Sequence, residues 1–469
     1  MAKTRIESDS LGKWELPAEA LYGVHTARAA ANFPITGTLL RDYPEAIQSL
    51  GMVKKAAALA NMELGVLDET IGQAISRACD RVIAGEADSA FIVDMVQGGA
   101  GTSTNMNANE VITNLALREL QREPGHYDHI HPNDHVNLSQ STNDAYPTAM
   151  RLTMVRMTPN LVVELKALKA AFLAKGVAFY DVIKVGRTQL MDAVPMRLGD
   201  EFKAFGVTIG EDAERLIEVA NLLREINLGG TAIGTGINTP AGYVACVTRH
   251  LSSVSGENVI AAGDLIEATS DMGAFVTFSG VLKRTSVKLS KICNDLRLLN
   301  SGPRAGFGEI KLPTVQAGSS IMPGKVNPVI PEVMNQIAYQ VIGNDLTVTM
   351  AAEAGQLQLN AMEPVIVFNI LQSMRMLTRG MKVLREKCVD GIEADAARCK
   401  ALLEHSLVAV TAINPYVGYA KASMVAKEAL HSGRSVRDVV LAKGLMTEAQ
   451  LDEAFTTENL LGQTHKGKF

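Results

Sequence analysis

Apolar residues recur every three or four positions over several unusually long segments of this 469-residue chain. Residues spaced in this way lie on one face of an α-helix. The pattern predicts long helices over residues 149–179, 200–227, 265–300, 329–352 and 357–387. A helix of about 30 residues extends about 45 Å, so five of them predict a bundle. The clearest series are Leu289, Ile292, Leu296 and Leu299, and later Leu371, Met374, Leu377, Met381 and Leu384.

The segments before and after these helices show a different pattern of apolar and polar residues. Up to about residue 140 the chain mixes short helical patterns with turn-rich stretches, and after Gly391 it becomes charged with a shorter apolar period. We therefore expect an all-α fold in three domains. These are a mostly helical N-terminal domain over 1–141, a central long-helix bundle over 142–390, and a small helical domain over 391–469. Apolar residues outside the main stripe of several long helices also indicate burial between copies of the chain.

The composition agrees with helices and narrows the range of partners. Hydrophobic residues make up 47% of the chain and aromatic residues 5%, with 20 methionines, which favours helices over sheets. A formal net charge of -5 and a pI near 6.0 provide no basic field for nucleic acid. No apolar run reaches the about 18 residues of a membrane span, and the first residues lack the core of a signal peptide. We expect a cytoplasmic protein without nucleic-acid or membrane partners.

The cysteines are odd in number, widely spaced and never paired in a CxxC motif. This pattern is typical of reduced thiols that fill core space, and it disfavours disulfides or a structural zinc site. The five are Cys79, Cys246, Cys293, Cys388 and Cys399.

One stretch carries most of the chemical information. Residues 317–328, which we call the signature loop, read Ala-Gly-Ser-Ser-Ile-Met-Pro-Gly-Lys-Val-Asn-Pro. Its glycines allow backbone N–H groups and the Lys325 cation to approach an anion. By composition alone, such a stretch is more often a surface loop rich in turn residues. The composition therefore leaves both interpretations open.

The order of residues in this loop resembles the signature of the aspartase/fumarase superfamily. Two further blocks support the resemblance in the expected order: Gly-Thr-Ser-Thr-Asn-Met-Asn-Ala-Asn-Glu at 101–110 and Gln-Ser-Thr-Asn-Asp at 140–144. Similarity to the ammonia-lyases of this superfamily runs nearly end to end. It implies an all-α protomer in three domains, whose central bundles assemble a homotetramer with active sites drawn from three subunits. Further matching stretches are 186–190, 233–236, 301–306 and 354–357.

The resemblance implies an ammonia-lyase that converts L-aspartate to fumarate and ammonia without a required cofactor. Removing the proton beside one carboxylate creates a doubly charged aci-carboxylate, so the site needs several preorganised donors. By family placement Ser319 is the general base, and nearby N–H groups and Lys325 favour its alkoxide form. The implied substrate-binding residues are Thr102, Ser141, Thr142 and Ser320 around the carboxylate that gains charge, Lys325 and Asn327 at the other carboxylate, and Asn143 and Thr188 at the amino group. Taken singly, each Ser or Thr is more often a helix cap or turn residue.

Gln189 bears on the choice of substrate, and we include it among the substrate-binding residues. Fumarases carry a histidine at this place that belongs to their acid–base apparatus, where Glu332 would be its partner. The Gln side chain cannot carry a proton near neutral pH. Elimination from malate expels hydroxide and needs an acid to protonate it, whereas the ammonium group of aspartate leaves as neutral ammonia and needs none. Aspartate is therefore favoured over malate, although some ammonia-lyases of the family also have His there. The alternatives are a fumarate hydratase and a non-catalytic structural relative, such as lens proteins related to argininosuccinate lyase; the retained reacting groups oppose the latter.

Two other features invite different chemistry. His129, His131 and His135 lie close together in sequence with two aspartates, but Pro132 and Asn133 make this a turn in which histidines are usually exposed or bonded to backbone. We expect no metal at the reacting atoms, while an activating divalent cation is compatible with the sequence. Glycine-rich runs at 98–101 and 229–236 complete neither GxGxxG nor GxxxxGK, so they predict no nucleotide site.

Overall fold

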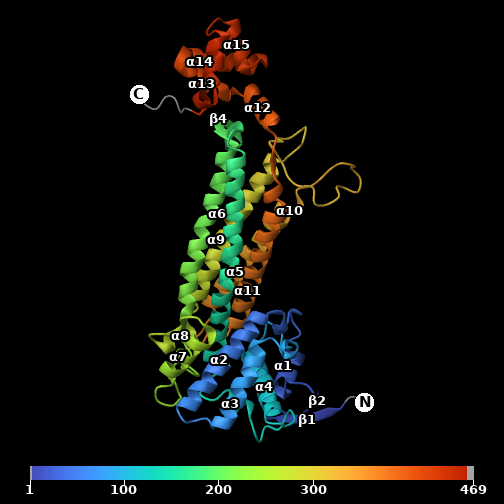
Figure 1. The fold of residues 1–469 in the computed structure, drawn as a ribbon, viewed down its shortest axis with the longest axis vertical. Helices are drawn as coiled ribbons and strands as arrows, with labels where there is room; N and C mark the ends of the chain where they lie inside the picture. The colour runs from blue at the N-terminus through green and yellow to red at the C-terminus, as the bar shows by residue number, and fades with distance from the viewer. Residues whose placement is uncertain (1–2, 462–469) are drawn as a thin grey trace. The chain divides into compact units, whose positions relative to one another are not determined.

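The computed structural model describes residues 3–461, which are mostly helical (Figure 1). Contacts between Cα atoms divide the chain into two compact units. Unit 1 comprises residues 1–162, 214–286 and 339–377, and unit 2 comprises residues 163–213, 287–338 and 378–469. The prediction of a mostly helical fold is confirmed. The three-domain division at 141 and 390 stays a prediction.

The five predicted long segments are confirmed as helices, and each contributes residues to both units. The prediction placed the start of the first one seven residues late, and it joined two helices that are separated at Asp271 and Met272. It also continued the second one past its end at Ala220 into strand β5 (Glu225–Ile226). The segment predicted from 357 begins as a turn and becomes helical at Glu363. The helices are α5 (Thr142–Ala178), α6 (Leu198–Ala220), α9 (Gly273–Leu299, after the short α8, Leu265–Ser270), α10 (Val329–Glu353) and α11 (Glu363–Lys387).

The two apolar series that predicted helix faces are buried. Every member of the series on α9 and on α11 has at most 4% of its surface exposed. Buried polar side chains also join the long helices within each unit, and each gains a hydrogen bond that offsets part of its desolvation. In unit 2, Asn335 of α10 donates to the Ser290 hydroxyl of α9 at 2.8 Å. In unit 1, Asn344 of α10 donates to the Ser373 hydroxyl of α11 at 3.0 Å.

The first part of unit 1 begins with a hairpin and continues with helices that pack on one another. Strands β1 (Thr4–Asp9) and β2 (Gly12–Pro17) pair antiparallel. Helix α2 packs against α3 and α7, and α3 packs against α4. The helices are α1 (Val24–Asn32), α2 (Pro44–Glu63), α3 (Glu69–Ile83), α4 (Thr102–Glu119) and α7 (Tyr243–Ser255).

Short two-stranded sheets are the part of the fold that the helical pattern did not predict. In unit 2, β3 (Ile183–Thr188) and β4 (Met191–Arg197) form an antiparallel hairpin, and β7 (Ile310–Lys311) pairs with β8 (Glu393–Ala394). In unit 1, β5 (Glu225–Ile226) and β6 (Ile260–Ala261) are parallel. Strands β5 to β8 have two residues each, too few for a period of two residues to stand out in the sequence.

The C-terminal helices have a hydrophobic core of their own. Ile413, Val425, Val439 and Leu451 are fully buried within it. No helix in the range 3–461 is long and apolar enough to cross a membrane. The helices are α12 (Ala396–His405), α13 (Val410–Val417), α14 (Tyr419–Ser432), α15 (Val436–Ala442), α16 (Glu448–Ala454) and α17 (Thr457–Leu460).

Candidate functional site

The first predicted site residue, Thr102, opens helix α4 in unit 1. The helix is preceded by Gly101, whose φ of 89° lies in the left-handed region. A Cβ atom at this position would lie 2.5 Å from the Tyr146 ring, so only glycine fits. The Thr102 hydroxyl donates to the Gly99 carbonyl at 2.7 Å, and the side chain is half-buried. The turn therefore fixes Thr102 at the N-terminal end of a long helix.

The second predicted block lies at the start of helix α5 and is joined to α4. The amide of Asn105, one turn after Thr102, donates to the Thr142 hydroxyl at 3.1 Å. The Ser141 hydroxyl accepts from the Asn143 backbone N–H at 3.2 Å, and the Asn143 amide donates to the Ala232 carbonyl at 2.7 Å. The structure thus brings the ends of α4 and α5 together. Both helix N-termini carry partial positive charge that favours a carboxylate.

A buried lysine, Lys54, supports the segment that leads into helix α5. The Lys54 ammonium donates to the side-chain carbonyl oxygens of Asn137 at 3.0 Å and of Gln140 at 2.9 Å. The same Asn137 oxygen accepts from Asn105 at 3.1 Å, so one network links α2, the 137–140 segment and α4. Lys54 is fully buried, and this burial lowers its pKa from 10.5 to about 7, opposed by the attraction of Asp144.

Asp144 fixes the same block to another part of unit 1. Its carboxylate accepts backbone N–H groups from Ser141, Gly229 and Thr231 at 2.9 to 3.0 Å. Burial raises the pKa of this carboxyl, and the three backbone hydrogen bonds oppose that effect. Two backbone N–H groups of the glycine-rich run at 229–236 therefore hold an internal carboxylate.

Thr188 and Gln189 lie at the tip of the β3–β4 hairpin in unit 2. Thr188 pairs with Met191, so Gln189 and Leu190 form the two-residue turn, with φ angles of 55° and 65°. A turn with two positive φ angles matches the twist of a hairpin but normally takes Asn or Gly. Non-glycine residues there store strain, which concentrates at functional positions. Thr188, Gln189 and Leu190 are all exposed.

A buried ion cluster holds the stem of this hairpin. The carboxylate of Glu309, whose side chain is fully buried, contacts the Arg187 guanidinium at 2.8 Å and the Lys184 ammonium at 2.9 Å. Lys184 also pairs with Glu201 at 2.7 Å. The Arg187 guanidinium stacks over the Phe307 ring at 4.1 Å from its centre. Arg187 directly precedes Thr188, so this cluster determines where the hairpin tip lies.

The signature loop leaves the helices of unit 2 as the gold segment before α10 (Figure 1). The Ser319 backbone N–H donates to the Lys325 carbonyl at 3.1 Å, and the Lys325 N–H donates to the Met322 carbonyl at 3.2 Å. The Ser319 hydroxyl accepts from the Ile321 backbone N–H at 3.3 Å, a contact that favours a charged oxygen. Ser319 is half-buried, whereas Ser320, Lys325 and Asn327 are exposed.

The structure thus groups the predicted residues into three sets. Unit 1 holds Thr102 and residues 141–143, and unit 2 holds the hairpin tip and the signature loop. Within residues 3–461, no backbone–backbone hydrogen bond joins the hairpin tip to the loop. The supporting residues that sequence reasoning missed are Lys54, Asn137 and Glu309. A charged residue within the apolar, alanine-rich stretch around Lys54 was the signal that could have found the first of them.

The histidine turn is arranged for backbone contacts. Pro132–Val136 forms one π-helical turn, and the Nδ1 atom of His131 accepts from the N–H groups of Asn133 and Asp134 at 3.3 Å. The Nδ1 atom of His135 accepts from the His131 N–H at 2.8 Å. Among the described residues, the group of side chains spaced to hold a metal ion lies elsewhere, at Glu63, Cys246 and His250.

Comparisons with known proteins identify the family of this chain. The family described as Lyase matches residues 12–343, and the family described as Fumarase C C-terminus matches residues 410–462. The chain belongs to the aspartase/fumarase superfamily. The aspartate ammonia-lyase of Pseudomonas fluorescens is 58% identical over 461 residues, which make up 98% of this chain and 96% of that protein.

Two solved structures of the superfamily share the fold over nearly the whole chain. One is a crystal structure of fumarate lyase:delta crystallin from Brucella melitensis bound to cobalt, with a TM-score of 0.95 and 57% identity over 98% of this chain and 99% of that one. The other is a class II fumarase from Schistosoma mansoni, with a TM-score of 0.91 and 32% identity over 98% of each chain. The superfamily therefore includes relatives named as aspartate ammonia-lyase and as fumarase, and the site residues have to distinguish between these two activities.

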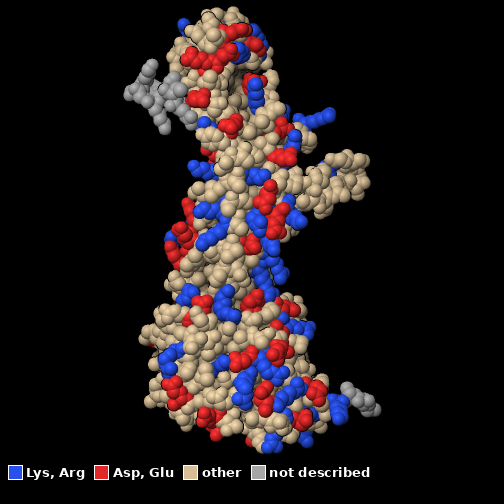
Figure 2. Space-filling view, in the orientation of Figure 1, with Lys and Arg blue, Asp and Glu red and all other residues tan. Residues whose placement is uncertain are grey.

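The face of the molecule shown in Figure 2 carries charges of both signs. Figure 2 shows Lys and Arg interspersed with Asp and Glu over the face that it presents. On this face, such mixing forms no broad field of one sign.

Proposed function

We propose that this chain catalyses the reversible anti elimination of ammonia from L-aspartate, giving fumarate. The observation that carries the proposal is its 58% identity to an aspartate ammonia-lyase over 98% of its length. An exposed glutamine at the hairpin tip supports the same choice of substrate. Gln189 offers an amide and no titratable group, so it suits a leaving group that departs as neutral ammonia.

Ser319 acts as the general base in this proposal. It removes a proton from the carbon beside one substrate carboxylate, and the electron pair of that C–H bond moves into the carboxylate to form an aci-carboxylate. The Ile321 N–H already contacts the Ser319 hydroxyl, and the turn that joins Ser319 to Lys325 keeps the base and the cation on one short segment. Both features favour the alkoxide that a serine base requires.

The remaining predicted residues serve as donors around the substrate. Thr102, Ser141, Thr142 and Ser320 would stabilise the carboxylate that gains charge, each hydroxyl contributing on the order of 3 kcal/mol in the transition state. Lys325 and Asn327 would hold the other carboxylate, and Asn143, Thr188 and Gln189 would face the amino group. Collapse of the aci-carboxylate then breaks the carbon–nitrogen bond and releases ammonia. No required cofactor enters this sequence of steps; an activating divalent cation stays a separate proposal.

We further propose that the active protein is a cytoplasmic homotetramer whose active sites combine residues from three subunits. Support comes from helix α10, on which four apolar side chains follow one another about one turn apart along one face and are exposed in the protomer. A second copy of the chain, which presents long helices of its own, is the partner that this face fits. The four are Tyr339 (59% exposed), Ile342 (36%), Leu346 (61%) and Met350 (65%).

One assay separates this function from its alternatives. Fumarate formation is followed by ultraviolet absorbance with L-aspartate and with L-malate, for the wild type and for Ser319→Ala. We expect fumarate from aspartate only, and a loss of about 100-fold to 10,000-fold in Ser319→Ala with unchanged assembly. Product from malate alone would identify a fumarate hydratase. A correctly assembled protein that consumes neither substrate would identify a non-catalytic relative.

A further inference from the structure

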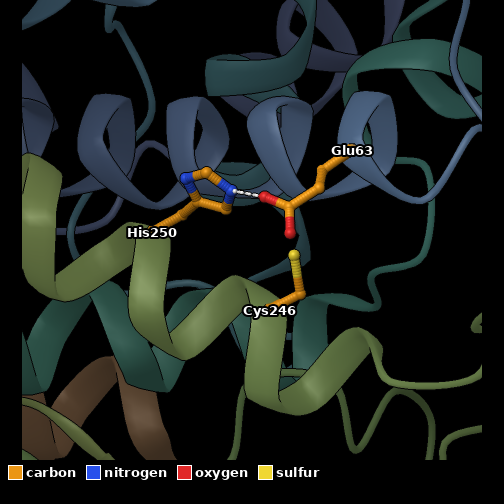
Figure 3. Close-up of side chains that lie close together, drawn as sticks. All are labelled: Glu63, Cys246 and His250. Carbon is orange, nitrogen blue, oxygen red and sulfur yellow. Dashed lines mark hydrogen bonds and ion pairs between the residues drawn. The ribbon is translucent and has the colours of Figure 1, made fainter.

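A cluster of metal-ligating side chains in unit 1 plays no part in the proposed reaction. Glu63 is the last residue of helix α2, and Cys246 and His250 lie one turn apart on helix α7 (Figure 3). One ligand atom from each residue, a carboxylate oxygen, Sγ and a ring nitrogen, lies within 4.8 Å of the other two. The sequence separation of four places Cys246 and His250 on one helix face, the spacing that pairs of metal ligands use.

The three side chains already point toward one another. The His250 Nε2 atom lies 2.8 Å from one carboxylate oxygen of Glu63 (Figure 3). Cys246 is 6% exposed, whereas the side chains of His250 and Glu63 are 19% and 47% exposed. Cys246 is therefore buried while Glu63 faces solvent, so an ion and a water ligand can reach the cluster from the side of Glu63.

A cation of the protein itself already contacts two of the three ligand residues. The Arg249 guanidinium donates to the other Glu63 oxygen at 2.5 Å and to the Cys246 sulfur at 3.5 Å. Its side chain is 60% exposed, so it can turn into solvent. Glu63 ends a helix, where the partial negative charge of the last carbonyl groups disfavours a carboxylate and favours a neighbouring cation. The position is therefore one that requires a positive charge.

We propose that Glu63, Cys246 and His250 bind a divalent transition metal ion of the zinc class, with a water molecule as fourth ligand and with Arg249 displaced. Thiolate, imidazole and carboxylate together select Zn²⁺ or Co²⁺ over Mg²⁺ and Ca²⁺, which prefer oxygen ligands. In a tetrahedral site with bonds of about 2.0 to 2.3 Å the ligand atoms are about 3.3 to 3.7 Å apart. The proposal requires the exposed Glu63 side chain to rotate and helix α7 to shift slightly, so that the three atoms, now within 4.8 Å of one another, reach that spacing.

Metal binding replaces the S–H bond of Cys246 with a sulfur–metal bond and involves no redox step. The Cys246 S–H bond breaks, the sulfur–metal bond forms, and the proton passes to the buffer. The ion would join the C-terminal end of α2 to α7, two helices that already pack together. Metal binding would therefore stabilise unit 1, and this effect does not depend on whether the chain acts on aspartate.

The test uses Co²⁺ as a spectroscopic probe on the full-length, chelator-treated protein. We expect one equivalent of Co²⁺ to produce a thiolate-to-cobalt charge-transfer band, Zn²⁺ to displace it, and Zn²⁺ to raise the melting temperature. Glu63→Gln, Cys246→Ser and His250→Gln should each weaken binding by at least about tenfold. Circular dichroism checks that each variant is folded. His129→Gln, at the exposed histidine turn, is the matched control and should bind as the wild type does.

Arg249→Gln distinguishes a metal site from a simple ion pair. Because Arg249 competes for the centre, removing its charge should tighten Co²⁺ binding several-fold, although it deletes an ion pair to Glu63. If the cluster only joins two helices, Arg249→Gln lowers the melting temperature and no stoichiometric cobalt band develops. A band in the wild type that persists in Cys246→Ser would equally overturn the proposal, since another thiol would then hold the ion.

Discussion

The backbone N–H of Ser319 donates a hydrogen bond to the carbonyl oxygen of Lys325 at 3.1 Å. This bond closes a turn over residues 319–325, so the proposed base and the proposed cation belong to one local structure. The Ser319 hydroxyl in turn accepts from the Ile321 N–H. The reactivity of Ser319 should therefore depend on how closely the two ends of this turn approach each other.

Gly318→Ala should open this turn. A Cβ atom at position 318 would lie 1.8 Å from the Lys325 carbonyl oxygen, a distance that no side chain can occupy. The turn has to widen, and a displacement of about 1 Å at a reacting group lowers turnover about 100-fold. We expect kcat for fumarate formation to fall by at least that factor with little change in the melting temperature, because the loop is exposed.

Gly324→Ala is the matched control on the same loop. Gly324 has a φ of 82° but no atom within 4 Å of an added Cβ, so the substitution costs only the backbone strain of about 1 to 2 kcal/mol. The loss of kcat should be smaller than in Gly318→Ala. Equal losses in the two variants would show that flexibility, and not the close contact at Gly318, limits the loop.

The signature loop also shows what the sequence could predict. The identities of Ser319 and Lys325 followed from the motif, because family placement depends on residue order. The hydrogen bond between them did not, since nothing in a motif states which backbone groups meet. The long helices were predictable because their apolar period extends over many turns, as the buried series from Leu289 to Leu299 confirms.

The buried carboxylate that supports the β3–β4 hairpin could not be predicted, and the reason is a different one. Glu309 lies 122 positions from Arg187, and a single charged residue has no period that reveals its partner. Lys54 was hidden in the same way, although its charge within an apolar stretch was a local signal. Buried polar networks depend on contacts distant in sequence, whereas helices depend on neighbours.

Glu309→Gln tests the role of that buried carboxylate. The change leaves the Arg187 charge, only 12% exposed, without its carboxylate partner, and breaking a buried pair from one side costs about 3 to 5 kcal/mol. We expect a lower melting temperature together with a lower kcat/KM, because the hairpin tip carries Thr188. Glu404→Gln is the control, since its ion pair with Lys400 is exposed and long at 3.9 Å. That variant should change stability by less than about 1 kcal/mol.

Lys54→Met should remove a specific pH dependence of stability. In the folded protein burial lowers the Lys54 pKa to about 7, against an ordinary value of 10.5. Between these values the unfolded chain holds more protons, so this group makes the folded state more stable as pH rises from 7 to 10.5. From pH 7 to pH 9 the wild type should gain about 2 to 3 kcal/mol relative to Lys54→Met.

Urea unfolding of both proteins at pH 7 and pH 9 measures this difference. Lys55→Met is the control, because the neighbouring Lys55 pairs with Asp80 and the Asp80 side chain is 55% exposed. The gap between the wild type and Lys55→Met should be the same at both pH values. A constant gap for Lys54→Met as well would mean that Lys54 stays charged in the folded protein throughout this range.

Leu346→Glu tests the assembly that the proposed composite site requires. Leu346 is 61% exposed in the protomer and lies on the same face of α10 as Tyr339 and Met350. If a second copy covers this face, a charge there has to be buried without a partner, which costs several kcal/mol. We expect multi-angle light scattering to show species smaller than a tetramer, and fumarate formation to fall in step with the loss of tetramer.

Leu430→Glu makes the same change of side chain at another exposed position. Leu430 is 73% exposed and lies on α14, outside the long helices. Its substitution should leave both assembly and activity unchanged, because solvent accepts the new charge. If Leu346→Glu also remains a fully active tetramer, the exposed face of α10 is not a subunit contact, and the three-subunit site would need another interface. If both variants dissociate, the contact extends to the C-terminal helices, because a charge is tolerated only where water reaches it.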